Sequence, residues 1–267
     1  MWEYEELKFS DAYKNHLVFE EIDYIRSFYD SLSYSCSFFM PNGTLRFINY
    51  TTYVYTAING TLESIYTLLK RGLITDAYVL LRKYFDDILL EIYINVILKD
   101  KYNWDDNLVV KEVEDWLKGK YRIPSIKKLL KYLKTSENSK DLYQYFGWDA
   151  ELKRFREILD DCVHGNRYNS VVLNCNKVYL SVREHHLKNF HIIIKRVFTI
   201  HLAFVFYLNP NYLTASDYVD YLDCHETPPE GSENWISSFA QEAFDKYIKR
   251  ETDLADFIKK VCYLEIK

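Results

Sequence analysis

The chain has 267 residues, a formal net charge of −5 and a pI near 5.8, which excludes the strongly basic class of protein that binds nucleic acid through its overall charge. With 48% hydrophobic and 27% charged residues, the sequence is typical of a globular protein rather than of a disordered or fibrous one. Five scattered cysteines and a polar beginning without an apolar signal segment predict reduced thiols and a cytoplasmic location.

The composition favours helices, because 25 tyrosines and 16 phenylalanines accompany only 7 glycines and 5 prolines. Few helix breakers and many large side chains are typical of long helices that pack through aromatic layers. Apolar residues in the region 45–72 keep three- and four-residue steps, and Gly72 can end a helix in the left-handed conformation. We therefore predict a first long helix here, although the FINYTTYVY segment has the composition of a strand.

A second long helix is predicted over residues 73–100, and the short LITD segment joins it to the first. A connection this short implies that the two helices are antiparallel neighbours. The polar segments 109–120, 123–133 and 136–147 follow, and they predict small helices that decorate this pair.

A third long helix is predicted from about Asp149 to Val163, ending before Gly165 because glycine adopts the left-handed cap conformation at little cost. Its expected inner stripe consists of Leu152, Phe155, Leu159 and Cys162. A fourth long helix is predicted over residues 178–208, where the apolar run is almost long enough to span a membrane. Basic side chains inside that run favour a buried helix instead: His191, Lys195, Arg196 and His201.

The region after residue 211 changes to shorter amphipathic pieces, for which Thr214 and Ser232 are candidate helix caps. We therefore expect an all-α protein. Residues 1–211 are predicted to form a bundle of about four long antiparallel helices with short decorating helices, and residues 212–267 a C-terminal helical extension packed on the bundle.

Arg82 interrupts an otherwise apolar part of the second predicted helix. Together with Asp86, four residues later, it falls between the core and the expected wet face of Asp76, Lys83, Asp87 and Glu91. One interpretation is a boundary salt bridge of little energetic weight. The other is that Arg82, held by Asp86, points into a cleft between helices, where its planar fork can bind a phosphate.

The segment DDCVHGNRYNS contains the second group of candidate residues. Arg156, Asp160 and His164 are each four residues apart, so on a continuing helix their side chains follow one stripe. Histidine gains and loses a proton near neutral pH, and Asp160 or Asp161 could orient its ring for work as a general acid or base. The alternative is that His164 only interacts with the last carbonyls of the helix.

The long helix with a mid-helix arginine, LLKRGLITDAYVLLRKYFDDIL, and the later helix ending in LDDCVHGN resemble the HEPN (higher eukaryotes and prokaryotes nucleotide-binding) superfamily over roughly residues 61–208. The resemblance implies a helical bundle and, for many members, a metal-independent endoribonuclease of a toxin or antiviral system. It implies that His164 assists attack of an RNA 2′-hydroxyl on the adjacent phosphate, while an arginine stabilises the developing charge.

The spacing of the candidate arginine departs from the family pattern. Seven residues separate Arg156 from His164, which is more than the family signature has between its arginine and histidine. Arg82 or Arg167 could therefore supply the positive charge in place of Arg156. Asn166, Arg167 and Asp160 are expected to contact the substrate.

The resemblance further implies RNA as substrate, a homodimer with two sites facing one groove, and a cognate antitoxin or other defence-system partner. We expect no cofactor, no metal and no membrane partner, and the sequence lacks the GxxxxGK[ST], GxGxxG and GxSxG motifs. The alternative function is a non-catalytic protein-binding module or a decayed HEPN partner protein. Its interaction surface would include Pro228, Pro229 and Trp235 in the HETPPEGSENW segment.

Overall fold

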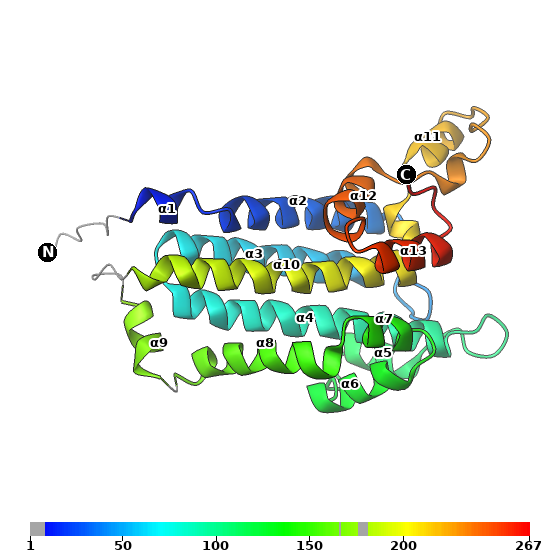
Figure 1. Ribbon diagram of the computed structural model, residues 1–267. Helices are drawn as coiled ribbons and strands as arrows, with labels where there is room; N and C mark the ends of the chain where they lie inside the picture. Colours follow the sequence, from blue (N-terminus) through cyan, green and yellow to red (C-terminus); the bar gives the residue numbers. More distant parts are fainter. Residues whose placement is uncertain (1–8, 166, 176–180) are drawn as a thin grey trace, which may run out of the picture. The chain divides into compact units, whose positions relative to one another are not determined.

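The computed structural model of the protein describes residues 9–165, 167–175 and 181–267 (Figure 1). The regular structure of these residues is helical, and their extended segments form only isolated bridges. The all-α class is therefore confirmed. The chain divides into two compact units. Unit 1 comprises Met1–Tyr29, Thr56–Leu89 and Gly147–Phe198, and unit 2 comprises Asp30–Tyr55, Leu90–Phe146 and Thr199–Lys267.

Long helices supply most of unit 1 and extend into unit 2. Among the described helices, four contribute a segment to each unit: α2 (Val18–Ser37), α3 (Tyr50–Lys70), α4 (Ile74–Lys101) and α10 (Val182–Leu208). The helices expected over 45–72 and 73–100 are confirmed as α3 and α4, and the fourth as α10 from Val182 onward. The expected start of the first helix at residue 45 is wrong, because residues 45–49 lie in the connection before α3. The predicted start of that helix at residue 178 lies outside the described residues.

The turn between α3 and α4 ends α3 at Gly72 as predicted, but α4 already begins at Ile74, so the LITD segment lies mostly inside α4 and is not the connection. Gly72 has a φ of +74°, in the left-handed region. Its N–H donates to the carbonyl of Leu69 over 3.0 Å, and the N–H of Leu73 donates to the carbonyl of Leu68 over 2.9 Å. This pair of hydrogen bonds is the Schellman pattern, which satisfies carbonyls that the end of α3 leaves open.

A buried arginine holds three backbone segments of unit 1 together. Arg183, in the first turn of α10, is fully buried. Its guanidinium donates to the carbonyls of Leu173 over 3.0 Å and of Cys175 over 2.7 Å, and also to the carbonyl of Gly72. The α3–α4 turn and the end of α9 (Tyr168–Leu173) are thereby fixed to the same side chain.

Unit 1 presents the expected third long helix as α8 (Trp148–Val163). Leu152, Phe155 and Leu159 are buried as predicted, whereas Cys162 is half-buried. The helix ends at His164, and Gly165 has a φ of +59°. In Figure 1, α8 runs alongside the first part of α4, and this placement brings the candidate residues of the two helices together.

Unit 2 contains most of the smaller helices. Those expected over 109–120, 123–133 and 136–147 are confirmed as α5 (Lys111–Leu117), α6 (Ile126–Thr135) and α7 (Lys140–Tyr145). The C-terminal region forms α11 (Asp217–Asp223), α12 (Ser238–Ala243) and α13 (Thr252–Val261). Three shorter helical segments accompany them: η1 (Pro210–Leu213), η2 (Ser232–Asn234) and the π-helical η3 (Phe244–Ile248).

Both predicted caps in the C-terminal region are wrong. The residue preceding α11 is Ser216, while the Thr214 hydroxyl donates to the carbonyl of Asn211 over 2.5 Å. Ser232 is the first residue of η2, and its hydroxyl donates to the carbonyl of Pro229 over 2.6 Å. Each hydroxyl is engaged by a carbonyl three residues back, so neither caps a following helix.

The apolar helix α10 is long and hydrophobic enough to cross a membrane, but 67% of its most apolar window is buried inside the protein. That degree of burial is typical of a core helix. In unit 2 the buried His201 of α10 contacts a carboxylate of α4, because His201 Nε2 lies 3.0 Å from Glu91 Oε2.

Candidate functional site

The centre of the candidate site in unit 1 is Arg82 on α4. Its NH2 atom lies 3.2 Å from Asp86 Oδ2, and its NH1 atom lies 3.3 Å from Asp160 Oδ1 on α8. The predicted i, i+4 pair of Arg82 and Asp86 is therefore confirmed. The side chain of Arg82 is 12% exposed, against 36% for Asp86 and 43% for Asp160. The guanidinium thus lies at the edge of the core, between two carboxylates that reach solvent.

The pKa of Asp86 reflects the charged side chains that surround it. Burial raises the pKa of Asp86 above its ordinary value, and the nearby negative charge of Asp160 also raises it. The positive charges of Arg82 and Arg156 act in the opposite direction and lower it. Arg156 is half-buried on α8. Two arginines and two aspartates, contributed by α4 and α8, therefore form one electrostatic cluster.

This cluster leaves hydrogen-bonding capacity unused. Among the described residues, the buried Nε of Arg82 and the buried Oδ1 of Asp86 have no hydrogen-bond partner. Buried polar atoms are normally paired with protein or water. One donor and one acceptor of the cluster are thus shielded from solvent and left for a buried water molecule.

His164 lies one helical turn beyond Asp160. It is the residue that ends α8, and its N–H donates to the carbonyl of Asp160 over 3.0 Å. Its imidazole is exposed and, within the described part of the chain, makes no hydrogen bond. The ring is therefore free to meet a ligand, and its position at a helix C-terminus also fits the capping interpretation.

The remaining candidate residues lie beyond the end of α8. Arg167 precedes α9, is exposed, and its NH2 atom lies 2.9 Å from Asp161 Oδ2. Asn166 lies outside the described residues. The structure therefore joins Arg82 to Asp160 and Arg167 to Asp161, so that each of the adjacent aspartates holds a different arginine.

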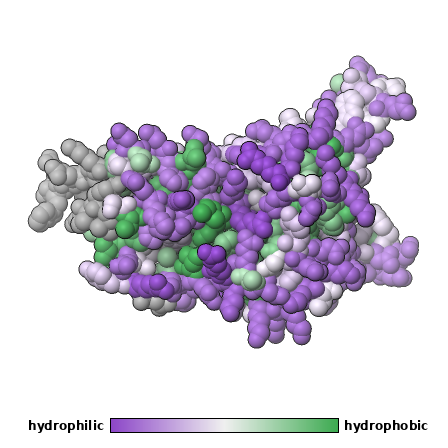
Figure 2. All heavy atoms as spheres, in the orientation of Figure 1, coloured by the Kyte–Doolittle hydropathy of each residue, from purple (hydrophilic) through white to green (hydrophobic). Residues whose placement is uncertain are grey.

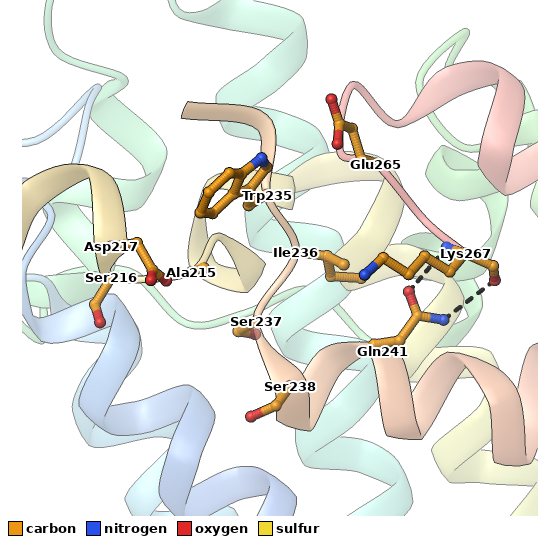
Figure 3. Close-up of a pocket in the computed structure, with 10 residues that line it drawn as sticks. All are labelled: Ala215, Ser216, Asp217, Trp235, Ile236, Ser237, Ser238, Gln241, Glu265 and Lys267. Atoms are coloured by element: carbon orange, nitrogen blue, oxygen red, sulfur yellow. Dashed lines mark hydrogen bonds between the residues drawn. The ribbon is translucent and has the colours of Figure 1, made fainter. Parts of the chain in front are cut away.

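A groove of about 620 Å³ lies elsewhere, in unit 2 (Figure 3). Trp235 forms one part of its lining, and the side chain of Lys267 extends across it toward Ile236. Gln241 holds the backbone of Lys267 through two hydrogen bonds, of 2.9 and 3.3 Å. Trp235 of the predicted interaction surface thus lines a groove, whereas Pro228 and Pro229 are not among its lining residues.

The sequence interpretation missed a buried polar network in unit 2. The carboxylate of Glu91 accepts hydrogen bonds from Tyr55 OH and Asn95 Nδ2, both over 2.6 Å, and contacts His201. Glu91 is only 3% exposed, so its assignment to the wet face of α4 is wrong. The signal that could have revealed it is His201, a polar residue inside the most apolar run of the chain.

No arrangement of metal ligands is present in the described parts of the chain, where three or more His, Cys, Asp or Glu side chains do not come together suitably. Comparisons with protein-family models, with curated proteins and with solved structures found no match to this chain. The class that fold and site define is therefore an all-α protein with an Arg–Asp cluster on α4 and α8 and an exposed histidine at the C-terminal end of α8.

Proposed function

We propose that the chain is a HEPN-like, metal-independent endoribonuclease that acts in the cytoplasm as a toxin or antiviral defence effector. The observation that carries the proposal is the contact of Arg82 with Asp160, one turn before the exposed His164. It supports a site in which a guanidinium from α4 and an imidazole from α8 serve the same ligand. A single-stranded RNA is the substrate that this chemistry suits.

In the proposed reaction, His164 takes the proton of a ribose 2′-hydroxyl as the 2′-oxygen attacks the adjacent phosphorus. The bond from phosphorus to the 5′-oxygen of the next nucleotide then breaks, and that oxygen receives a proton. The products are a 2′,3′-cyclic phosphate and a 5′-hydroxyl end. Arg82, assisted by Arg156, stabilises the negative charge that develops on the phosphate, and Asp160 orients Arg82.

The contacts around the two arginines define their proposed roles. Arg82 has two carboxylate partners and a buried Nε without a partner among the described residues, so it suits a fixed clamp. Arg167 is exposed and paired with Asp161, so it suits a contact to RNA outside the reacting phosphate. A homodimer that places two such sites across one groove, and a cognate antitoxin that covers them, belong to the same proposal.

The test is cleavage of a fluorescently labelled single-stranded RNA by the purified protein in the presence of EDTA. The His164→Ala variant is expected to lose cleavage with an unchanged melting temperature, because the imidazole is exposed. General acid–base catalysis by one side chain contributes about 10²- to 10⁴-fold. His185→Ala is the matched control, since His185 is an exposed histidine on α10 in the same unit. Equal cleavage by His164→Ala and the parent would refute the proposal.

One observation favours the alternative, a protein-binding module. The groove lined by Trp235 in unit 2 combines an aromatic wall with serine, amide and charged side chains (Figure 3), which is the composition of many recognition sites. If the parent protein cleaves no RNA, this groove becomes the better candidate. Trp235→Ala should then weaken capture of a partner protein, whereas His164→Ala should not.

A further inference from the structure

An exposed apolar loop in unit 2 connects α2 to α3. Phe47 is 88% exposed, and the neighbouring Leu45 and Ile48 are 64% and 60% exposed. Phe38 and Met40 earlier in the same connection are also exposed. Single exposed apolar side chains are ordinary, but a run of them on one loop marks a surface that meets another apolar phase. We call residues 38–48 the apolar loop.

A basic segment of unit 2 follows α5. Residues 117–135 contain seven Lys or Arg residues and no Asp or Glu, in a chain whose net charge is −5. The segment includes α6, which buries Leu129 and Leu133 and leaves its lysines exposed. Figure 2 shows hydrophilic side chains gathered over the region that α5, α6 and α7 occupy in Figure 1. We call residues 117–135 the basic segment.

The apolar loop and the basic segment meet at the end of α5. The N–H of Leu45 donates to Glu114 Oε2 over 3.0 Å, and Arg46 donates to the carbonyl of Leu117 over 3.0 Å. Lys118 lies 2.9 Å from Glu114, so the same carboxylate holds both segments. The exposed apolar side chains therefore emerge beside the first cations of the basic segment.

Most of this positive charge is not neutralised within the described parts of the chain. Lys118 pairs with Glu114, but exposed cations of the basic segment make no ion pair with a described residue: Lys120, Arg122, Lys127, Lys128 and Lys131. The adjacent loop 103–108 adds two acidic residues, together with the exposed Trp104 and Leu108. The seven cations of the basic segment outnumber these two carboxylates, so the surface keeps a net positive charge next to exposed apolar side chains.

We propose that the apolar loop and the basic segment form a docking surface for an anionic lipid membrane. Clusters of about four to eight cations recognise anionic headgroups, and adjacent apolar side chains insert into the boundary between headgroups and acyl chains. The contact is peripheral and reversible and involves no membrane-spanning segment. It replaces the expectation from the sequence that the chain has no membrane partner. It goes beyond the nuclease proposal and does not depend on it.

Two other occupants fit this surface less well. RNA would use the cations, but it offers no apolar phase for aliphatic side chains such as Leu45, Ile48 and Met40, which do not stack on bases as aromatic rings do. A second copy of the chain, paired symmetrically through the same patch, would bring two basic segments against each other. Charge complementarity and the exposed aliphatic side chains together favour lipid.

The test is co-sedimentation of the full-length protein with vesicles of phosphatidylcholine alone or of phosphatidylcholine with phosphatidylserine. The parent is expected to bind the anionic vesicles, and added salt should weaken the binding. The Phe47→Ser/Ile48→Ser variant should bind on the order of tenfold more weakly. The Lys120→Ala/Arg122→Ala variant should lose a similar factor or more. All four side chains are exposed, so melting temperatures should be unchanged.

Matched controls come from unit 1. Tyr168→Ser removes an aromatic ring that is 80% exposed, and Lys153→Ala/Lys188→Ala removes two exposed cations. Both controls should bind vesicles as the parent does. The proposal is overturned if the parent does not bind anionic vesicles, or if Phe47→Ser/Ile48→Ser binds them as tightly as the parent does. It is also overturned if the cation variant loses binding to a single-stranded RNA while vesicle binding persists, because the surface then belongs to nucleic acid.

Discussion

Replacing Arg183 with methionine would remove the buried guanidinium of unit 1 while keeping a side chain of similar length. Arg183 donates to backbone carbonyls of the α3–α4 turn, of the last residue of α9 and of the segment just after α9. Because the side chain is fully buried, water does not replace it without a local rearrangement. The variant therefore leaves three carbonyl oxygens without their donor.

The expected loss of stability in Arg183→Met follows from these hydrogen bonds. Hydrogen bonds that involve a charged group contribute about 1.5–3 kcal/mol each, and they are not additive when they share one donor group. Methionine carries no charge that must be desolvated on folding, and this offsets part of the lost stability. We expect a decrease of about 3–5 kcal/mol in the free energy of unfolding. In a chain of this size, each 1 kcal/mol lowers the melting temperature by roughly 2 °C, so the shift should be about 6–10 °C.

Thermal unfolding followed by circular dichroism measures this shift directly. Lys188→Met is the control, because Lys188 is an exposed cation on the same helix and its loss should move the melting temperature by about 1 °C or less. If Arg183→Met melted within 2 °C of the parent protein, the three carbonyls would not depend on the guanidinium. The role of Arg183 as the tie between these segments would then be wrong.

Three further substitutions test the carboxylates of Asp86 and Glu91. Burial raises the pKa of Asp86, so the contribution of its protonated form to stability is present below the unfolded pKa near pH 4 and is lost as the pH rises through the folded pKa. The melting temperature of Asp86→Asn should therefore rise relative to that of the parent between pH 4 and pH 7. A difference in melting temperature that stays constant over this range would contradict the prediction. Glu91→Leu removes the acceptor shared by Tyr55, Asn95 and His201 and should cost about 3 kcal/mol or more in chemical denaturation, whereas Glu91→Gln, which keeps one acceptor oxygen, should cost less.

Elements with strong periodicity and clear stop signals could be predicted from sequence. The end of α3 at Gly72 and of α8 before Gly165 follows from local preference alone, because glycine tolerates the left-handed conformation that both residues adopt. The helix α2 carries an equally clear signal that the sequence interpretation did not use. Six of its buried residues recur in alternating steps of four and three: Val18, Ile22, Ile25, Tyr29, Leu32 and Cys36.

The candidate site was predictable only where its contacts are local. Arg82 and Asp86 are one turn apart on a single helix, so their pairing follows from helical geometry. The contact of Arg82 with Asp160 joins residues 78 positions apart, and it depends on how α8 packs against α4. The burial of Glu91 could not be predicted for the same reason. A charged side chain is assigned to solvent unless its partner is known, and the partner of Glu91 is His201, 110 residues away in the sequence.

The division into two units has a practical consequence for mapping activity. The boundaries after Tyr29, Tyr55, Leu89 and Phe198 fall inside α2, α3, α4 and α10, and neither unit is a continuous stretch of chain. A truncated gene product ending at any of these positions would carry severed helices with exposed apolar faces, and aggregation would be its expected fate. Deletion mapping would therefore report misfolding. The roles of the proposed nuclease site and of the proposed docking surface must be tested with point substitutions in the intact chain.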